Sequence, residues 1–186
     1  MIEAELKARV QAPAETLGRL EELAAGRAEV YRDTYYDTPD KALEGRGAEL
    51  RVRTVHGPDD TRTVLTYKGA AVDAASGSKP EHETRVVDVE AVHALLHGLG
   101  YVPVIAFEKR CRNYAFTSAG GRRMLATLVV VPELDGTFLE VETAAEEKEL
   151  AEALADVRTV MAGLGIAEDD LTRELYTDAV RARRTV

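Results

Sequence analysis

Residues 2–10 alternate strictly between apolar and charged side chains. The apolar positions share one parity: Ile2, Ala4, Leu6, Ala8 and Val10. Every position between them carries a full charge. A period of two is that of a β-strand, because successive side chains point to opposite faces. The pattern therefore predicts an N-terminal strand with one apolar face and one charged face.

Similar patterns continue along the chain. Seven further segments with alternating, β-branched or aromatic residues are predicted as strands: 29–37, 49–55, 62–68, 81–87, 102–116, 123–131 and 137–143. Four segments with apolar residues at helical spacing are predicted as helices: 13–25, 88–98, 145–163 and 169–183. The small and polar residues 69–80 predict a flexible loop. Strands outnumber helices and mostly follow one another, which favours an α+β fold, an antiparallel sheet or barrel with helices outside.

Length and composition fit a single domain over residues 1–186, with the C-terminal helices of residues 145–183 packing on the barrel. Hydrophobic residues make up 45% and charged residues 31%, which is ordinary for a globular protein and argues against wholesale disorder. The formal net charge of −9 argues against a general binder of nucleic acid or of anionic membranes. Apolar runs fall short of the roughly 20 residues that span a bilayer.

Cysteine usage and the first residues bear on the compartment. Cys111 is the single cysteine, which excludes an internal disulfide framework and a multi-cysteine zinc site. The first residues show neither the basic nor the apolar region of a signal peptide. We therefore expect a cytoplasmic protein.

Full charges recur at every second position of the later strands as well. Each strand could show its polar face to water, as strands of antiparallel sheets commonly do. Alternatively, the charged faces converge inside a closed barrel, which at eight strands leaves room for one small ligand. Solvent-facing strands usually mix in Thr, Ser and Gln, whereas these positions are mostly full charges. Both readings stay open at this point.

The second reading has a chemical consequence. The interior acids would be Glu3, Glu5, Glu81, Glu83, Glu140 and Glu142. The interior bases would be Lys7, Arg9, Arg51, Arg53, Arg62, Lys68 and Arg85. Basic side chains pair with phosphate oxygens, and closely spaced carboxylates need a hard cation such as Mg²⁺ or Mn²⁺ between them. The pattern therefore indicates a small, metal-chelated polyphosphate as the ligand.

Residues 3–7, Glu-Ala-Glu-Leu-Lys, resemble the N-terminal Glu-x-Glu-x-Lys signature of the CYTH superfamily, the triphosphate tunnel enzymes. That superfamily includes class IV adenylyl cyclases, thiamine triphosphatases and inorganic tripolyphosphatases. Further segments are similar to family motifs and follow in the family order: 35–39, 50–53, 65–69, 81–83 and 136–142. The resemblance covers nearly the whole chain.

The resemblance implies an antiparallel eight-strand tunnel that binds a triphosphate together with Mg²⁺ or Mn²⁺. It implies metal ligation by Glu3, Glu5, Glu140 and Glu142. It implies triphosphate binding by Lys7, Arg51, Arg53 and Lys68, to which strand parity adds Arg85. Glu5 and Lys7 are predicted to act in catalysis, Lys7 by helping to position and deprotonate the attacking water.

One later strand departs from the family pattern, which usually reads Lys-x-Arg with a Tyr beyond it. Anchoring on Tyr114 aligns Lys109 but leaves Cys111 in the place of the Arg. A shift of one residue aligns Arg110 and Arg112 instead. Because a slip of one residue turns the other set outward, Lys109 and the two arginines are alternative triphosphate ligands.

Two further positions bear on the same resemblance. Val130 stands where many members of the superfamily carry an additional metal-ligating Asp, which predicts weaker metal binding or altered chemistry. Tyr176 resembles a tyrosine near the C-terminus of the family, and a packing role explains it equally well.

Three functions follow as hypotheses. The first is metal-dependent hydrolysis of a triphosphate, which could be inorganic tripolyphosphate, thiamine triphosphate or a nucleoside triphosphate. The second is a class IV adenylyl cyclase that makes cyclic AMP and pyrophosphate from ATP. The third is a non-catalytic module that binds polyphosphate or a nucleotide. In each case we expect a small-molecule partner, no nucleic acid or membrane, and a monomer or homodimer.

Overall fold

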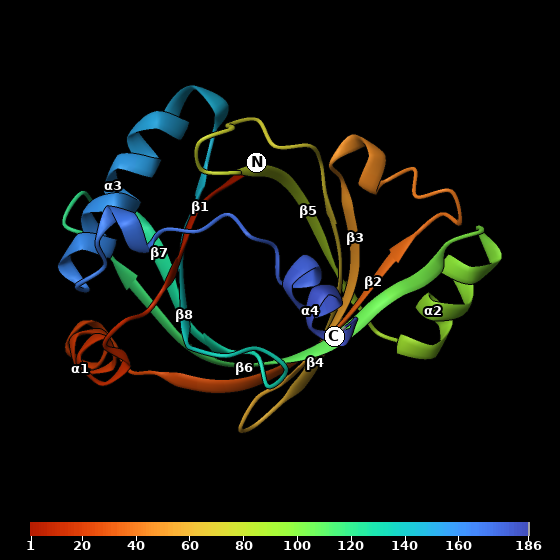
Figure 1. Cartoon of the computed structure of the whole chain (residues 1–186), viewed down its shortest axis with the longest axis horizontal. Helices are drawn as coiled ribbons and strands as arrows, with labels where there is room; N and C mark the ends of the chain where they lie inside the picture. Colours follow the sequence, from red (N-terminus) through yellow and green to blue (C-terminus); the bar gives the residue numbers. More distant parts are fainter. Residues whose placement is uncertain (186) are drawn as a thin grey trace.

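Eight antiparallel strands close into a barrel in the computed structural model, which describes residues 1–185 (Figure 1). The strands are β1 (Ile2–Arg9), β2 (Arg27–Asp37), β3 (Glu49–His56), β4 (Thr61–Lys68), β5 (Lys79–Val86), β6 (Val102–Thr117), β7 (Arg123–Val130) and β8 (Phe138–Ala145). Their order around the barrel is β1-β5-β4-β3-β2-β6-β7-β8. The predicted α+β barrel is confirmed. Residue 186, the last of the predicted single domain, lies outside the described residues.

The register of β1 against β8 decides which charges become neighbours. Glu5 lies opposite Glu142, and Lys7 lies opposite Glu140. On its other side, β1 pairs with β5 through Ile2 and Glu3. Antiparallel strands bring directly opposite side chains within about 5 Å of one another, so this register concentrates carboxylates on the inner face of the barrel.

The hydrophobic core lies outside the barrel wall. The apolar outer face of β1, which includes Leu6 and Ala8, packs against Leu154, Val157 and Met161 of α3 (Leu150–Gly163). Helix α1 (Pro13–Leu23) joins the same cluster. The two faces of β1 thus have different roles: the apolar positions pack against helices, and the charged positions face the barrel interior.

A second core cluster covers the other side of the barrel. Helix α2 (Val89–Gly98) buries Val92 and Leu96 against Leu50 and Val52 of β3. In Figure 1, α2 lies on the side of the barrel opposite α1 and α3. The described helices include none that is both long and apolar enough to cross a membrane.

The C-terminal part differs from the predicted helix over 169–183. Residues 168–170 form a 3₁₀ turn, residues 171–175 are extended, and α4 (Tyr176–Arg184) begins only then. The cause is pairing with β1: Leu171 forms a β-bridge with Ala8, and the Thr172 N–H donates to the Lys7 carbonyl at 2.8 Å. We call residues 171–175 the strap, because they cross one mouth of the barrel (Figure 1).

Candidate functional site

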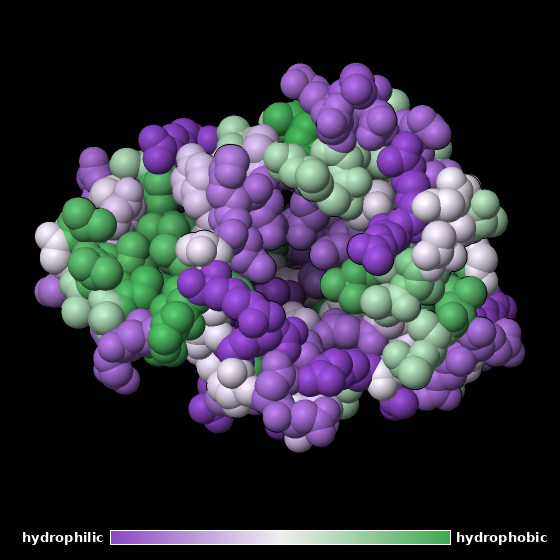
Figure 2. Space-filling view, turned by 180° about the vertical axis from the view of Figure 1, so that it is seen from behind, coloured by the Kyte–Doolittle hydropathy of each residue, from purple (hydrophilic) through white to green (hydrophobic). Residues whose placement is uncertain are grey.

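The interior of the barrel holds a charged cavity of about 320 Å³. Side chains from all eight strands line it, together with residues 76–78, 172–173 and 175–177. The charged lining residues are Glu3, Glu5, Lys7, Glu49, Arg51, Arg53, Arg62, Lys68, Lys79, Glu81, Glu83, Lys109, Glu140, Glu142 and Arg173. Figure 2 shows the hydrophilic hollow from the side opposite the strap. Of the two readings of the charged faces, convergence inside a barrel is the one that the structure shows.

Three of the four predicted metal ligands lie together. Carboxylate oxygens of Glu3, Glu5 and Glu142 lie within 4.8 Å of one another. Burial and the charges of Glu140 and Glu3 raise the pKa of Glu5 to about 7. Burial and the charges of Glu3 and Glu5 raise the pKa of Glu142 well above its ordinary value. Lys68 pairs with Glu3, but the three carboxylates outnumber this cation, and their oxygen donors suit a hard divalent cation.

Glu140 lies outside this cluster. Its carboxylate faces the ammonium of Lys109 at 3.4 Å. Burial alone would raise the pKa of Glu140, but the charges of Lys109 and Lys7 outweigh burial and lower it. Glu140 is therefore charged and lies apart from the other three carboxylates, so the residues present fit a metal held by Glu3, Glu5 and Glu142.

Arg53 forms an ion pair with Asp33, a residue that the sequence pattern did not indicate. Its Nε and Nη2 donate to the two carboxylate oxygens of Asp33 at 2.6 and 2.7 Å. The Asp33 side chain is fully buried, and despite that burial the charge of Arg53 and its hydrogen bonds lower the pKa of Asp33 to about 2. Asp33 lies directly opposite Arg53 in the pairing of β2 with β3. Asp33 could therefore be identified only from the register that places β2 against β3.

The remaining predicted triphosphate ligands of β1, β3 and β4 line the cavity and differ in their present partners. Lys68 forms ion pairs with Glu3 and Glu81. Arg51 has no carboxylate partner within residues 1–185, and its buried Nε lacks an acceptor there. Lys7 donates to the Glu174 carbonyl of the strap, and burial lowers its pKa. Lys7 and Arg51 thus form no ion pair with a carboxylate among residues 1–185.

Strand β6 resolves the two alternative alignments. Lys109 points into the barrel and lines the cavity, whereas Arg110 and Arg112 point outward. Arg110 pairs with Glu108 at 3.4 Å and Arg112 with Glu21 of α1 at 3.0 Å. The prediction that Arg110 and Arg112 bind the triphosphate is therefore wrong.

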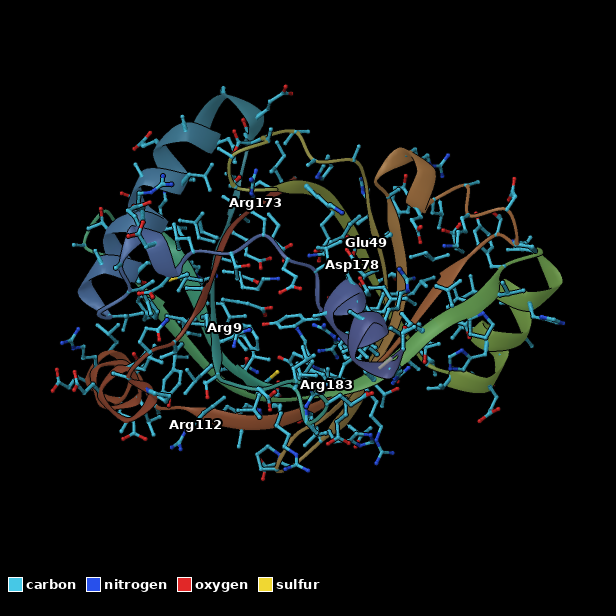
Figure 3. The ribbon with its side chains drawn as sticks, in the orientation of Figure 1. Arg9, Glu49, Arg112, Arg173, Asp178 and Arg183 are labelled. Carbon is cyan, nitrogen blue, oxygen red and sulfur yellow. The ribbon has the colours of Figure 1, made fainter. Side chains whose placement is uncertain are left out.

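Two further predicted interior bases lie at the ends of their strands. Arg85 has the inward parity of β5, but it is exposed and does not line the cavity. Arg9 is also exposed and donates to the Asp135 carbonyl at 3.1 Å (Figure 3). The predicted role of Arg85 in triphosphate binding is therefore corrected. Parity determines which face of a strand a side chain lies on, but not how deep in the barrel it lies.

The position of Val130 requires a similar correction. Val130 is 39% exposed and lies on the outer face of β7. The inward residues of this strand include Leu125 and Thr127, which lie opposite Glu142 and Glu140. Within the described chain, the inner face of β7 therefore supplies no carboxylate to the acidic cluster.

Tyr176 is part of the site. Its ring lies 4.4 Å from the Lys7 ammonium and 4.7 Å from that of Lys109, and Phe138 packs edge-on against it. The residue is 8% exposed, and its hydroxyl has no hydrogen-bond partner among residues 1–185. The ring face attracts both ammonium groups and so holds two like charges side by side.

Comparisons with known proteins agree with this geometry. The family model described as "CYTH domain" matches residues 1–176. A relative from Methanocaldococcus jannaschii named "Putative adenylate cyclase" is 23% identical over 181 residues, which cover 96% of this chain and 98% of the relative. A solved structure of a Pyrococcus horikoshii protein superposes with a TM-score of 0.83 at 27% identity, covering 98% of this chain and 99% of the other.

A solved structure from Hippeastrum shares the fold at greater distance. Its TM-score is 0.66 at 16% identity, and the match covers 97% of this chain and 95% of the other. That protein is described as a "Putative adenylyl cyclase" that reveals a dominant triphosphatase activity. At this identity, the likeness shows the fold alone.

Proposed function

The chain belongs to the CYTH domain family, and from this premise we propose that it hydrolyses a triphosphate inside the barrel with the help of a divalent metal ion. One observation carries the proposal. A three-carboxylate cluster and two cations without carboxylate partners, Lys7 and Arg51, line the same cavity. A polyphosphate with its counter-ion needs both kinds of group within reach.

The metal would be Mg²⁺ or Mn²⁺, and Glu3, Glu5 and Glu142 would hold it. The raised pKa values of Glu5 and Glu142 support this assignment, because they reflect burial together with repulsion between neighbouring carboxylates, and a bound cation would offset both. A bound divalent ion neutralises phosphate charge and polarises phosphoryl oxygens. Glu140 would stay ionised beside Lys109, because the charges of Lys109 and Lys7 lower its pKa.

The protein's own side chains would supply the rest of the chemistry. Arg51 would place its guanidinium on phosphate oxygens, a bidentate contact that suits its planar shape. Burial lowers the pKa of Lys7, so the neutral amine, the form that takes the proton of the attacking water, is easier to reach than in an exposed lysine. The water oxygen then bonds to phosphorus while the bond to the leaving phosphate breaks, and the charge of Arg51 stabilises the products' extra negative charge.

A second candidate is formation of cyclic AMP and pyrophosphate from ATP. The name of the archaeal relative, which matches 96% of this chain, favours it. Both reactions need the same charged cavity and differ in the nucleophile, which is water in hydrolysis and the ribose 3′-hydroxyl in cyclisation. The relatives therefore support the triphosphate chemistry more firmly than the choice of nucleophile.

One assay separates the candidates. Purified protein is incubated with Mg²⁺ or Mn²⁺ and, separately, with tripolyphosphate, thiamine triphosphate and ATP, and phosphate, pyrophosphate and cyclic AMP are measured. Metal-dependent release of phosphate supports the triphosphatase, whereas cyclic AMP with pyrophosphate supports the cyclase. Tight tripolyphosphate binding without turnover of any of the three substrates would instead support a non-catalytic binding module.

A further inference from the structure

The cations that line the cavity differ in whether a carboxylate already neutralises them. Five form ion pairs with acids of the barrel: Lys68, Lys79, Arg53, Arg62 and Lys109. Three form no such pair in the chain up to residue 185: Lys7, Arg51 and Arg173. An anion gains most from cations of the second group, because no existing ion pair has to be broken.

Arg173 belongs to the strap, which is anchored on both sides of it. The Thr172 N–H donates to the Lys7 carbonyl at 2.8 Å, and the Lys7 ammonium donates in turn to the Glu174 carbonyl. Arg173 therefore stands between two residues that are tied to the same position of β1. Figure 3 shows it at the rim of the barrel, on the segment that crosses the mouth.

The present partner of Arg173 is a weak one. Its Nη1 donates to the Ala74 carbonyl in the loop between β4 and β5, and Ser76, Gly77 and Ser78 of that loop line the cavity. A backbone carbonyl is neutral and occupies one of the five N–H donors of a guanidinium. Phosphate oxygens are charged and accept two of these donors side by side, so they bind a guanidinium more strongly.

We propose that Arg173 is a further triphosphate-binding residue and that a phosphate oxygen replaces the Ala74 carbonyl as its acceptor. The inference rests on the proposed function, since it assigns a new ligand to the same cavity. It makes the strap a part of the binding site, because one short segment then presents both Arg173 and the carbonyl that positions Lys7.

The test is a titration of tripolyphosphate into the full-length protein by calorimetry, in EDTA and again in Mg²⁺. Arg173→Gln should weaken binding about tenfold or more, the usual effect of losing a charge-assisted hydrogen bond. Arg173→Lys keeps the charge and should lose less. Arg183→Gln is the matched control, because Arg183 is likewise an exposed arginine of the C-terminal region (Figure 3), but it pairs with Asp135 and does not line the cavity. Its affinity should equal that of the wild type.

The outcomes separate this inference from the proposed function. A thermal melt of each variant checks that the fold is intact. Wild-type affinity in Arg173→Gln, together with weakened binding in Arg51→Gln, overturns the role of Arg173 and leaves the proposed function standing. Equal weakening in Arg173→Gln and Arg183→Gln also overturns it, since a general loss of charge would then be the cause. Absence of tripolyphosphate binding by the wild type overturns both.

Discussion

Asp33 and Arg53 show what a satisfied buried charge looks like in this cavity. Two short hydrogen bonds join them, and Asp33 stays ionised with a pKa of about 2. Glu5 and Glu142 are equally interior, but burial and the mostly negative charges around them raise their pKa values. The ion pair of Asp33 with Arg53 therefore resembles a structural feature. The acidic cluster instead resembles a binding site, because an added cation would stabilise its carboxylates.

Replacement of Glu5 tests the acidic cluster directly. Glu5→Gln removes one of the three carboxylates and adds amide donors where a cation would bind, so metal-dependent turnover should fall by at least about 100-fold. Phosphate release from tripolyphosphate at saturating Mg²⁺ or Mn²⁺ measures the effect. Glu146→Gln is a suitable control, because Glu146 is exposed at the end of β8 and should tolerate the change. Full activity of Glu5→Gln would refute the metal assignment.

The pKa of Glu5 predicts how pH acts on the metal-free protein. Folding raises this pKa from 4.5 to about 7, so the folded state binds a proton that the unfolded chain has released between these values. Proton binding by Glu5 therefore stabilises the folded state. This stabilisation is fully present below pH 4.5 and is lost as the pH rises to about 7. A metal replaces the proton, so Mn²⁺ should raise the melting temperature more at pH 8 than at pH 5.5.

Thermal melts with EDTA or Mn²⁺ at the two pH values check this expectation. In Glu5→Gln the difference between the two Mn²⁺ effects should shrink, whereas Glu146→Gln should behave as the wild type. A stabilisation by Mn²⁺ that is the same at both pH values would show that proton and metal do not compete at Glu5.

At the scale of the elements, the sequence predicted which face of a strand each side chain occupies, but not how deep in the barrel the side chain lies. The alternation of residues 2–10 correctly separated the face that binds helices from the face that lines the cavity. Arg110 and Lys109 are one residue apart on a strand with charge on both faces, so alternation could not choose between them. Tertiary packing made the choice, since Phe107 and Cys111 share the parity of Lys109 and are buried.

The strap was missed for a related reason. Its leucines have helical spacing, but the backbone donor of Thr172 binds the Lys7 carbonyl instead of continuing a helix. Local sequence carries no information about a partner that lies more than 160 positions earlier in the chain. The ion pair of Asp33 with Arg53 likewise depends on the register of two strands. Periodicity therefore predicted the faces of the elements, while partners distant in sequence required the structure.

Contacts between helix α3 and the outer face of β1 should dominate the stability of the barrel wall. Met161 is 2% exposed and packs in the cluster that contains β1, so Met161→Ala should lower the free energy of unfolding by about 2–5 kcal/mol. Leu95 of α2 is 64% exposed, and Leu95→Ala should change it by less than about 0.5 kcal/mol. Urea denaturation followed by circular dichroism measures both. Equal effects would mean that α3 does not hold the wall.

On the scale of the whole molecule, the barrel inverts the usual arrangement of charge. Its lining contains eight basic and seven acidic residues, so the net charge of −9 arises entirely outside the cavity. A ligand must therefore pass a negative exterior to reach the cations. Figure 2 shows that the hollow opens to the surface, so a short anion has a route to them. A long polyanion would meet the acidic exterior along most of its length.

The charge distribution predicts selection by size among polyanions. At about 50 mM salt, where non-specific nucleic-acid binding is strong, a labelled single-stranded or duplex oligonucleotide should show no change in fluorescence polarisation up to high micromolar protein. Tripolyphosphate should bind under the same buffer conditions, because it is short enough to enter a cavity of about 320 Å³ and to reach Lys7 and Arg51. Oligonucleotide binding that tripolyphosphate displaces would contradict the prediction, since the cations would then have to be reachable from the outer surface.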